Sequence, residues 1–477
     1  MREGTTDRKG PRYDKKDRKS ILRHAAKLTG HMLSDFEEMD MDSSPVHVKG
    51  YFGQALETLY FDIDNNNSPL PDFPEAGIEL KSTPMKETRK GLVSKERLVL
   101  GIIDYMAVKN KGSWHDVFEK KSGDLLIVFY RYESDRPFYQ FEVVKVVEWT
   151  FPEEDLRIIK EDWDRIEQYI LEGRAEELSE GLTNYLAACT KGAGHGKDMR
   201  IQPFSDKMAK QRALSLKQSY VNRIFEESTD LSEIVGEENL DDRKGPAERI
   251  HADSQSIFEE PWDVSTTFED AVVGRMSKFV GRRCVEIEDM TGTVNTESKS
   301  YYAMLARHML GIRTRDIEEF RNADIVMKTV RLDTRGRSRE SMSFPHFDYK
   351  EIVGQDWEDC DFHEQIDKKF FFAVYQMCDA ENKDKRAARF LGSFFWTMPY
   401  EDMEEARKVW ERARDAVAEG RYDELPKESQ SYVSHVRPHG RDSSDTIEGP
   451  DGKQHVKKCF WLNRDYITGI ARRLMRP

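Results

Sequence analysis

The sequence contains no long apolar run. None of its 477 residues lies in a stretch that approaches the length of a membrane span, and the charged N-terminal segment has no apolar signal region. The five cysteines form no C-x-x-C pair. Neither a phosphate-binding loop nor a dinucleotide fingerprint occurs, so no nucleotide energy source is implied. These absences predict a soluble protein of a reducing cytoplasm, without membrane contact.

The length and composition indicate two globular domains. A chain of 477 residues exceeds one ordinary domain. Apolar residues make up 38% and charged residues 34%, with 25 Phe, 18 Tyr and 8 Trp, so the chain can bury sizeable cores.

The charge is unevenly distributed. A net charge of −14 argues at first against a polyanionic partner. However, residues 186–225 hold eight bases and two acids, whereas residues 226–242 hold eight acids and no base. The basic segment is typical of a nucleic-acid interface, although a solvated face would have the same composition. The acidic block predicts the start of a linker.

An internal repeat divides the chain. "WTFPEEDLRIIKEDW" from Trp149 is matched by "WTMPYEDMEEARKVW" from Trp396, 247 residues later, and the match continues without a gap. Each copy predicts an amphipathic helix that begins after a proline and ends at a glycine. We therefore expect a tandem of two α/β domains, each a mixed sheet flanked by helices, at 1–225 and 263–477, with an acidic linker at 226–262.

The first copy carries a group of charges that the second copy loses. At the same offset, Asp72 in "DFPEAGIELK" falls on Glu319, Glu79 on Val326 and Lys81 on Lys328. Because the strand tolerates valine in place of Glu79, the acid is not needed for folding. An Asp followed by E-x-K on a strand is a ligand set for metal-assisted phosphodiester hydrolysis. Surface salt bridges produce the same pattern by chance.

Two further residues fit the same chemistry. Glu57, on the preceding expected helix, could help hold a metal or its water, and its counterpart is Met304. Lys121, before the strand "DLLIVFYRY", could touch a phosphate. An exposed helix acid and a flanking surface lysine are the alternative interpretations.

These motifs resemble a known family. "DFPEAGIELKSTP", "SKERLVL", "DWDRIEQYILEGRAEELSEGLTNYLAACTKGAG" and "QPFSDKMAKQRALSLKQSY" are similar to the type II restriction endonucleases that cut at GATC and are related to the mismatch-repair nicking enzyme MutH. "MSFPHFDY", "HVRPH" and "FWLNRDYI" extend the similarity to the Sau-type, two-domain branch of that family.

The resemblance implies a fold and a set of site residues. It implies restriction-endonuclease-like PD-(D/E)xK domains in which Asp72, Glu79 and Lys81 form the catalytic trio and Glu57 is an auxiliary acid. A further catalytic lysine matches Lys121, with Lys120 as its competitor. Asp72, Glu79 and Glu57 would hold Mg²⁺. The second domain would be catalytically silent, bind another copy of the site and stimulate cutting by the first.

DNA-binding residues are expected in both copies. The segment "CTKGAGHGKDMR" resembles the base-reading loop of the family, and small residues there let a backbone approach DNA. Ser215 aligns with an aromatic residue that senses adenine methylation in the mismatch-repair relative. His435 and His439 are interpreted as loop histidines rather than a metal pair. The expected DNA contacts are Thr190, Lys191, Gly192, Lys197, Arg200, Lys207, Arg212, Ser215, Lys217, Arg437 and His439.

The resulting prediction is a Mg²⁺-dependent type II restriction endonuclease that cuts double-stranded DNA at GATC. A strand-nicking repair endonuclease and a non-catalytic DNA-binding regulator are the alternatives. Self-association on DNA and a cognate DNA methyltransferase are the expected partners, the latter from the resemblance alone.

Overall fold

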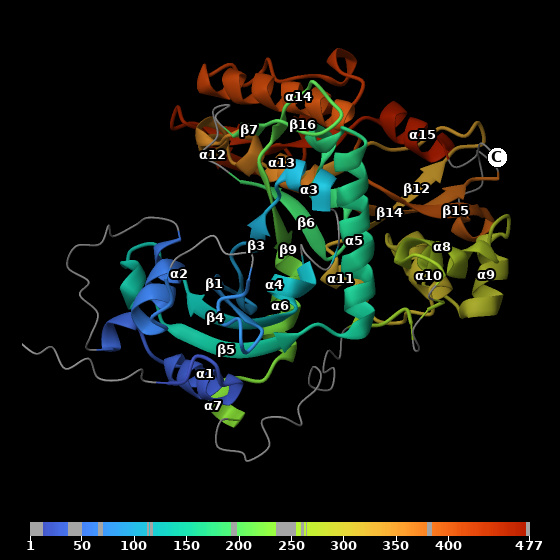
Figure 1. Ribbon diagram of the computed structural model, residues 1–477. Coiled ribbons are helices and arrows are strands. Elements are labelled where there is room, and N and C mark those ends of the chain that lie inside the picture. Colours follow the sequence, from blue (N-terminus) through green and yellow to red (C-terminus); the bar gives the residue numbers. More distant parts are fainter. Residues whose placement is uncertain are drawn as a thin grey trace, which may run out of the picture. The chain divides into compact units, whose positions relative to one another are not determined.

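The chain forms two compact units. The computed structural model describes residues 13–36, 50–64, 70–111, 114, 118–191, 198–234, 254–258, 262–263, 265–378 and 384–473. The first unit comprises Met1–Leu178 and Tyr185–Ala252, and the second comprises Ser179–Asn184 and Asp253–Pro477 (Figure 1). Within the described residues, none of the helices has the length and apolar character that a membrane span requires.

The first unit is built on a four-stranded mixed sheet. Its order is β2-β1-β4-β5, in which β1 runs parallel to β4 and the other neighbours are antiparallel. The central strand β4 reads as a buried apolar run because helices and turns cover both of its faces. The bounds are β1 Ile78–Thr88, β2 Gly91–Ser94, β4 Asp124–Arg131 and β5 Val143–Thr150.

A smaller sheet lies in the same unit. Its order is β3-β9-β6, and both pairings are antiparallel. A hairpin of β7 and β8 connects β6 to β9. The bounds are β3 Leu98–Ile102, β6 Leu186–Thr190, β7 Met199–Arg200, β8 Ala209–Lys210 and β9 Arg212–Leu216.

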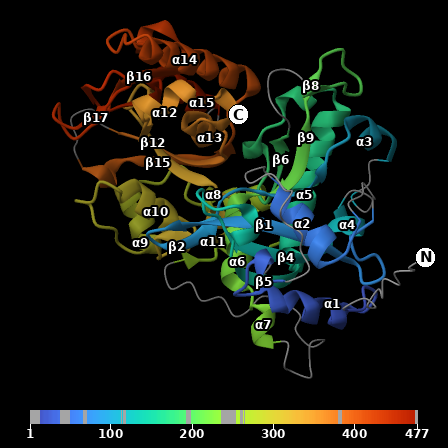
Figure 2. The ribbon, with the colours of Figure 1, turned by 90° about the vertical axis from the view of Figure 1, so that its left-hand side faces the viewer.

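Helices cover the sheets of the first unit. The long helix α5 follows Pro152, buries its apolar stripe and ends at Gly173, whose φ of 69° suits a helix C-terminus. In Figures 1 and 2, α1 and α7 lie together beside β5. The bounds are α1 Arg18–Ala25, α2 Tyr51–Ala55, α3 Tyr105–Lys111, α4 Lys120–Ser122, α5 Glu153–Leu171, α6 Gln218–Glu227 and α7 Leu231–Ile234, with a π-helical turn, η3, at Leu56–Tyr60.

The start of the expected linker is part of the first unit. Residues 226–234 contain the end of α6 and all of α7, and Leu231 is buried in the first core. Most of the remaining expected linker lies outside the described residues. The described part of the first unit therefore extends beyond residue 225.

The second unit has sheets of matching topology. A sheet of order β12-β14-β15 again has a parallel followed by an antiparallel pair, and a second sheet has the order β13-β19-β16. Two small ribbons, β10-β11 and β17-β18, complete the strands that the structure describes. The bounds are β10 Ser254–Gln255, β11 Asp316–Ile317, β12 Val326–Leu332, β13 Met342–His346, β14 Phe370–Gln376, β15 Arg389–Trp396, β16 Ser434–Pro438, β17 Thr446–Glu448, β18 Gln454–Val456 and β19 Lys458–Leu462.

The helices of the second unit also follow the expected pattern. Helix α14 starts after Pro399 and ends at Gly420, whose φ is 72°. The helices α8 and α10 pack beside β15 and β12, as Figure 2 shows. The bounds are α8 Phe268–Ser277, α9 Cys284–Thr291, α10 Tyr301–Met309, α11 Glu318–Asn322, α12 Tyr349–Gly354, α13 Asp361–Ile366, α14 Tyr400–Ala418 and α15 Arg464–Arg473.

Strand register relates the two units residue by residue. Glu79 lies opposite Leu125 in the first sheet, and Val326 lies opposite Phe370 in the corresponding sheet. The offset of 247 residues therefore holds for β1 and β12, but it becomes 245 for β4 and β14. It returns to 247 at Trp149 and Trp396, which lie opposite Leu125 and Phe370. The connections before and after β4 thus differ in length between the units.

Buried tyrosines make the same contacts in both units. Tyr220 Oη donates to Asp155 Oδ2 at 2.7 Å, and Tyr466 Oη donates to Asp402 Oδ2 at 2.8 Å. Tyr105 in α3 and Tyr349 in α12 each donate to a strand carbonyl, at Lys210 and Val456 respectively.

Candidate active site

A tight turn brings Asp72 beside the start of β1. Phe73 pairs with Ile78, and Gly77 takes a φ of 68°, which favours glycine. Asp72 and Glu79 are consequently adjacent in space. The backbone N–H of Asp72 donates to Glu79 Oε2 at 3.1 Å, and Leu80 N–H donates to Asp72 Oδ2 at 3.0 Å.

Glu79 is the buried centre of the cluster. Its side chain is only 1% exposed, and two ammonium groups face it. Lys81 Nζ lies 2.5 Å from Glu79 Oε1, and Lys121 Nζ, from α4, lies 3.6 Å from the same oxygen. Two cations therefore offset a carboxylate that would otherwise be costly to bury.

Glu57 belongs to the same electrostatic cluster. Burial raises its pKa, Asp72 and Glu79 add to the increase, and Lys81 and Lys121 oppose it. Burial also raises the pKa of Glu79, an effect that Lys81 counteracts and Asp72 reinforces. The structure thus brings together all five residues that were predicted to be catalytic.

The local backbone around Glu57 is unusual. Glu57 lies in the π-helical turn η3, which directly continues α2. Such turns occur frequently at functional sites because they redirect side chains from a regular helix. No sequence pattern had signalled this turn.

Lys121 and Lys120, the two candidates for the second catalytic lysine, differ in burial and in their distance from Glu79. Both begin α4, but Lys120 is exposed, whereas Lys121 is half-buried and reaches Glu79. The geometry therefore favours Lys121 as the second lysine of the site.

The chemistry of the donors fits a hard divalent cation. Glu57, Asp72 and Glu79 supply oxygen ligands, and the three carboxylates outnumber the two lysines. Within the described residues, no group of three or more His, Cys, Asp or Glu side chains is placed so that it could hold a metal ion by itself. Mg²⁺ is usually held by one or two carboxylates together with water and substrate phosphates, so an open set of this kind suits it.

Comparisons with known proteins identify the family. The family model described as the DNA mismatch repair enzyme MutH matches residues 61–162, which include Asp72, Glu79, Lys81 and Lys121. The type II restriction enzyme Sau3AI of Staphylococcus aureus is 30% identical, over 90% of this chain and 94% of its own length. This chain belongs to the MutH-related type II restriction endonucleases.

The mismatch-repair relatives match a smaller part of the enzyme. MutH of Shewanella woodyi is 28% identical over 42% of this chain and 87% of its own length. MutH of Yersinia enterocolitica is 24% identical over 42% of this chain and 80% of its own length. The enzyme is accordingly a type II site-specific deoxyribonuclease with a MutH-like restriction endonuclease domain. It acts on DNA, and enzymes of this fold generally use a divalent metal.

The predicted DNA contacts of the first unit divide by exposure. Thr190 ends β6, Lys191 follows it, and Arg200 and Lys207 are exposed in or near the β7–β8 hairpin. Lys207 also pairs with Glu176 at 3.0 Å. Gly192 and Lys197 lie outside the described residues.

Three of the predicted DNA contacts need correction, because they are buried. Arg212 donates to Ala188 O at 2.7 Å, and the hydroxyl of fully buried Ser215 donates to Ala187 O at 3.2 Å. Lys217 is only 5% exposed. Arg212 and Ser215 lie in β9, the central strand of its sheet, and Lys217 directly follows that strand, so these buried side chains are not presented on the surface.

The second unit presents a cation on an aromatic ring. The guanidinium of Arg437 lies 3.7 Å from the ring centroid of Trp461, and His439 contacts the same ring edge-on. His435, in contrast, is buried within β16 and hydrogen-bonds Asn463. The interpretation of His435 as a loop histidine was therefore wrong, whereas Arg437 and His439 are exposed.

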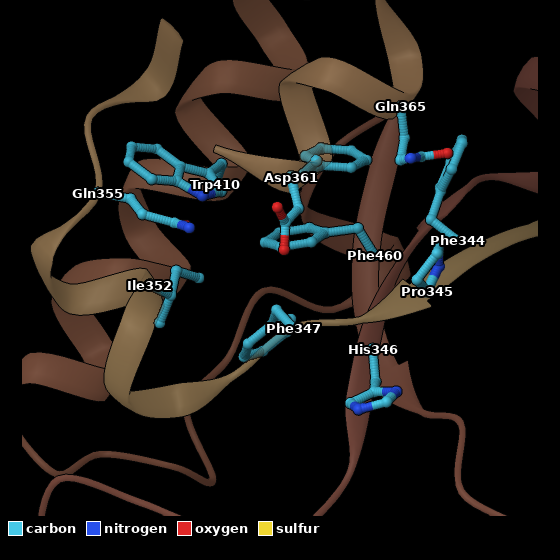
Figure 3. A pocket seen from close by; sticks show the side chains of 11 residues that line it. Phe344, Pro345, His346, Phe347, Ile352, Gln355, Asp361, Gln365, Trp410 and Phe460 are labelled. Atoms are coloured by element: carbon cyan, nitrogen blue, oxygen red, sulfur yellow. The ribbon is translucent and has the colours of Figure 1, made fainter. Parts of the chain in front are cut away.

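Two other features were not signalled by the sequence. Phe204, between β7 and β8, is 67% exposed, has a φ of 61° and lies under the ammonium of Lys109. Exposed strained residues often mark functional segments. In the second unit, a cavity of about 100 Å³ is lined mainly by aromatic side chains, and Figure 3 shows Gln355 and Asp361 extending into it. No predicted site residue lines this cavity.

Proposed function

We propose that the enzyme hydrolyses double-stranded DNA at GATC with Mg²⁺ bound at the cluster of Glu57, Asp72 and Glu79. The observation that carries this proposal is the convergence of two lysines and three acids at the start of β1. The GATC site is inferred from the similarity of the sequence motifs to the family that cuts there.

Each residue of the cluster has a role in this reaction. Asp72 and Glu79 hold the metal, and Glu57 supports it. When bound, Mg²⁺ supplies positive charge that offsets the charge developing on the phosphorus oxygens. Lys81 orients the attacking water in line with the leaving oxygen, and Lys121 contacts the phosphate. Burial of Glu79 keeps competing water away from its carboxylate.

Sequence is read, in this proposal, by the segment that follows β6. Thr190 and Lys191 approach the base edges, and Arg200 and Lys207 hold neighbouring phosphates. Gly192 and Lys197 belong to the same proposed loop. A cognate methyltransferase that protects host DNA, and pairing of two molecules to cut both strands, are parts of the proposal that come from the family resemblance.

The second unit is proposed to be a duplicated, catalytically silent copy that binds another GATC site and stimulates the first. The shared strand registers and the matching tyrosine contacts support duplication. Replacement of the acids by Met304 and Val326 supports the loss of catalysis. The proposed catalytic domain extends from residue 1 through helix α7, past the expected boundary at 225, and the effector domain covers residues 263–477, with the linker between them.

A plasmid digest tests the catalytic proposal. We expect linear DNA with GATC ends in the presence of Mg²⁺, and sequencing of the ends would locate the cut. Accumulation of nicked circles at every enzyme dose would instead support a strand-nicking activity. Absence of cleavage, despite binding, would leave only a DNA-binding regulator.

The effector proposal has its own test. Short uncleavable GATC duplexes are added to a digest of a substrate with a single site, and a scrambled duplex serves as the control. We expect faster cutting with the GATC duplex alone. An unchanged rate, together with binding of only one duplex per chain, would contradict the role of the second unit.

A further inference from the structure

The degenerate site of the second unit retains one charged residue of the original set. Lys328 lies in β12 at the register position of Lys81 in β1, since Lys81 lies opposite Ile127 and Lys328 lies opposite Phe372. Val326 replaces Glu79, and Met304 on α10 replaces Glu57. The lysine has thus survived the loss of its carboxylate partners.

The second lysine of the set is also missing. Because β4 and β14 are related by 245 residues, the position four residues before Phe370 corresponds to Lys121. That position is Ile366, which is fully buried. Lys368, which the constant offset of 247 would pair with Lys121, instead forms an ion pair with Asp324 at 2.9 Å.

The acid that corresponds to Asp72 is directed elsewhere. Glu319 is buried, and its carboxylate accepts hydrogen bonds from Ile257 N and Ser256 Oγ. Asp324, at the place of Gly77, is engaged by Lys368. Both acids, at the positions that correspond to Asp72 and Gly77, are therefore bound to other groups.

Lys328 is left with a poorly compensated charge. Its side chain is half-buried, and burial alone lowers its pKa, with no carboxylate among the described residues raising it. A partly desolvated ammonium without an anion destabilises the fold. Its position suits a ligand that brings the missing negative charge.

We propose that Lys328 binds a backbone phosphate of DNA at the degenerate site of the second unit. In the first unit, Lys81 occupies the corresponding place beside the proposed scissile phosphate. A phosphodiester held by Lys328 meets no metal-binding acids and stays intact. This inference rests on the proposed function of the second unit and identifies a residue through which it grips DNA.

The test compares two lysines of the second unit. Binding of GATC duplex to the full chain is measured in a cleavage-deficient Glu79→Gln background by fluorescence anisotropy, at several salt concentrations, and two binding steps are resolved. We expect Lys328→Met to weaken the second step by about tenfold and to reduce its salt slope by about 0.9, the loss of one phosphate contact. Lys328→Arg should restore most of the slope.

Lys368→Met is the matched control, because Lys368 is already paired with Asp324. It should leave the salt slope unchanged. The melting temperature of the free chain is a second readout: Lys328→Met should raise it, since an uncompensated charge is removed, whereas a purely structural lysine would lower it.

The outcomes distinguish a failure of this inference from a failure of the proposed effector function on which it rests. If Lys328→Met leaves the affinity and the salt slope of the second duplex unchanged, the role of Lys328 is overturned, but the effector proposal is not. A chain with wild-type Lys328 that never binds a second duplex overturns the effector proposal, and this inference with it. A fall in melting temperature on Lys328→Met also overturns the inference.

Discussion

The two units share a strand framework but differ in where they keep buried charge. The first concentrates charge at the start of β1, where Glu79 is 1% exposed between two lysines. At the corresponding place, the second has Val326, a lone Lys328 and the buried Ile366. The helix also differs, because Glu57 lies in a π-helical turn whereas Met304 lies in the regular helix α10. The strand framework thus persists without this charge, as the proposed catalytic role of the charge requires.

The two units also differ in the contacts of the acids Asp155 in α5 and Asp402 in α14. In the first unit, buried Arg223 joins Asp155 and Glu227, at 2.8 and 2.9 Å. The residue three positions after the matching tyrosine of the second unit is Gly469, so that unit has no cation at this position, although the contact between Tyr466 and Asp402 is kept. Here the first unit uses an ion network for packing, and charge alone therefore does not identify a catalytic site.

The largest expected effect on cleavage comes from Glu79 in β1, where β12 has Val326. Glu79→Ala should reduce cleavage by about 10³-fold or more, because a proposed metal ligand is lost. Val326→Ala, the matched change in the second unit, should alter cleavage by less than about twofold. Plasmid linearisation rates measure both. Comparable activity of Glu79→Ala and wild type would refute the assignment.

The buried ion network gives the next largest effect. Arg223→Met leaves Asp155 and Glu227 buried without their cation and should destabilise the first unit by about 3–5 kcal/mol. Tyr466→Phe removes one hydrogen bond and should cost the second unit about 1 kcal/mol. Hydrogen exchange of the β4 and β14 amides reports on each unit separately. Equal losses in the two units would show that Arg223 adds little.

A smaller effect should distinguish adjacent lysines. Lys121→Met should slow cleavage by about 10- to 100-fold, since its ammonium faces Glu79, whereas exposed Lys120→Met should change it by less than about twofold. Single-turnover cleavage rates provide the measurement. The reverse order would restore Lys120 as the catalytic lysine.

The smallest effect concerns stability and pH. Burial lowers the pKa of Lys328, so the folded state disfavours the charged ammonium. Folding stability is therefore unaffected by this group above the unfolded pKa, where the amine is neutral, and it decreases as the pH falls through the folded pKa. Lys328→Met should therefore stabilise the second unit at pH 7, and this gain should shrink as the pH rises toward the ordinary lysine pKa of about 10.4. Denaturant unfolding at both pH values tests the sign. A gain independent of pH would mean that improved packing, not charge, is responsible.

The sequence repeat predicted much of this framework because apolar periodicity and helix ends are local signals. The helices α5 and α14, and the strands β1 and β12, occur where the repeat placed them. The change of offset at β4 and β14 could not be predicted, since loops absorb length differences without a local pattern. A constant offset of 247 would pair Lys121 with Lys368, whereas the strand register places Ile366 there.

The composition of the basic segment was a weaker guide. A count of Lys and Arg does not reveal which face of a strand a side chain occupies. Arg212, Ser215 and Lys217 were grouped with Lys191 and Arg200, but the first two are buried in β9, the middle strand of its sheet, and Lys217 is buried directly after it. In contrast, Asp72, Glu79 and Lys81 were predictable as a group, because one turn and alternation along one strand are enough to bring them together.

The hydrogen bonds that Glu319 accepts from Ser256 and Ile257 would make the proposed loss of the site in the second unit hard to reverse. An acid that corresponds to Asp72 has become an anchor for the chain that enters this unit. Restoring glutamate at 304 and 326 would return two of the lost side chains, yet the third carboxylate could turn toward the site only by releasing that anchor. In the proposed duplication, the second unit has exchanged a ligand for a structural bond, so one or two substitutions would not be enough to give it activity.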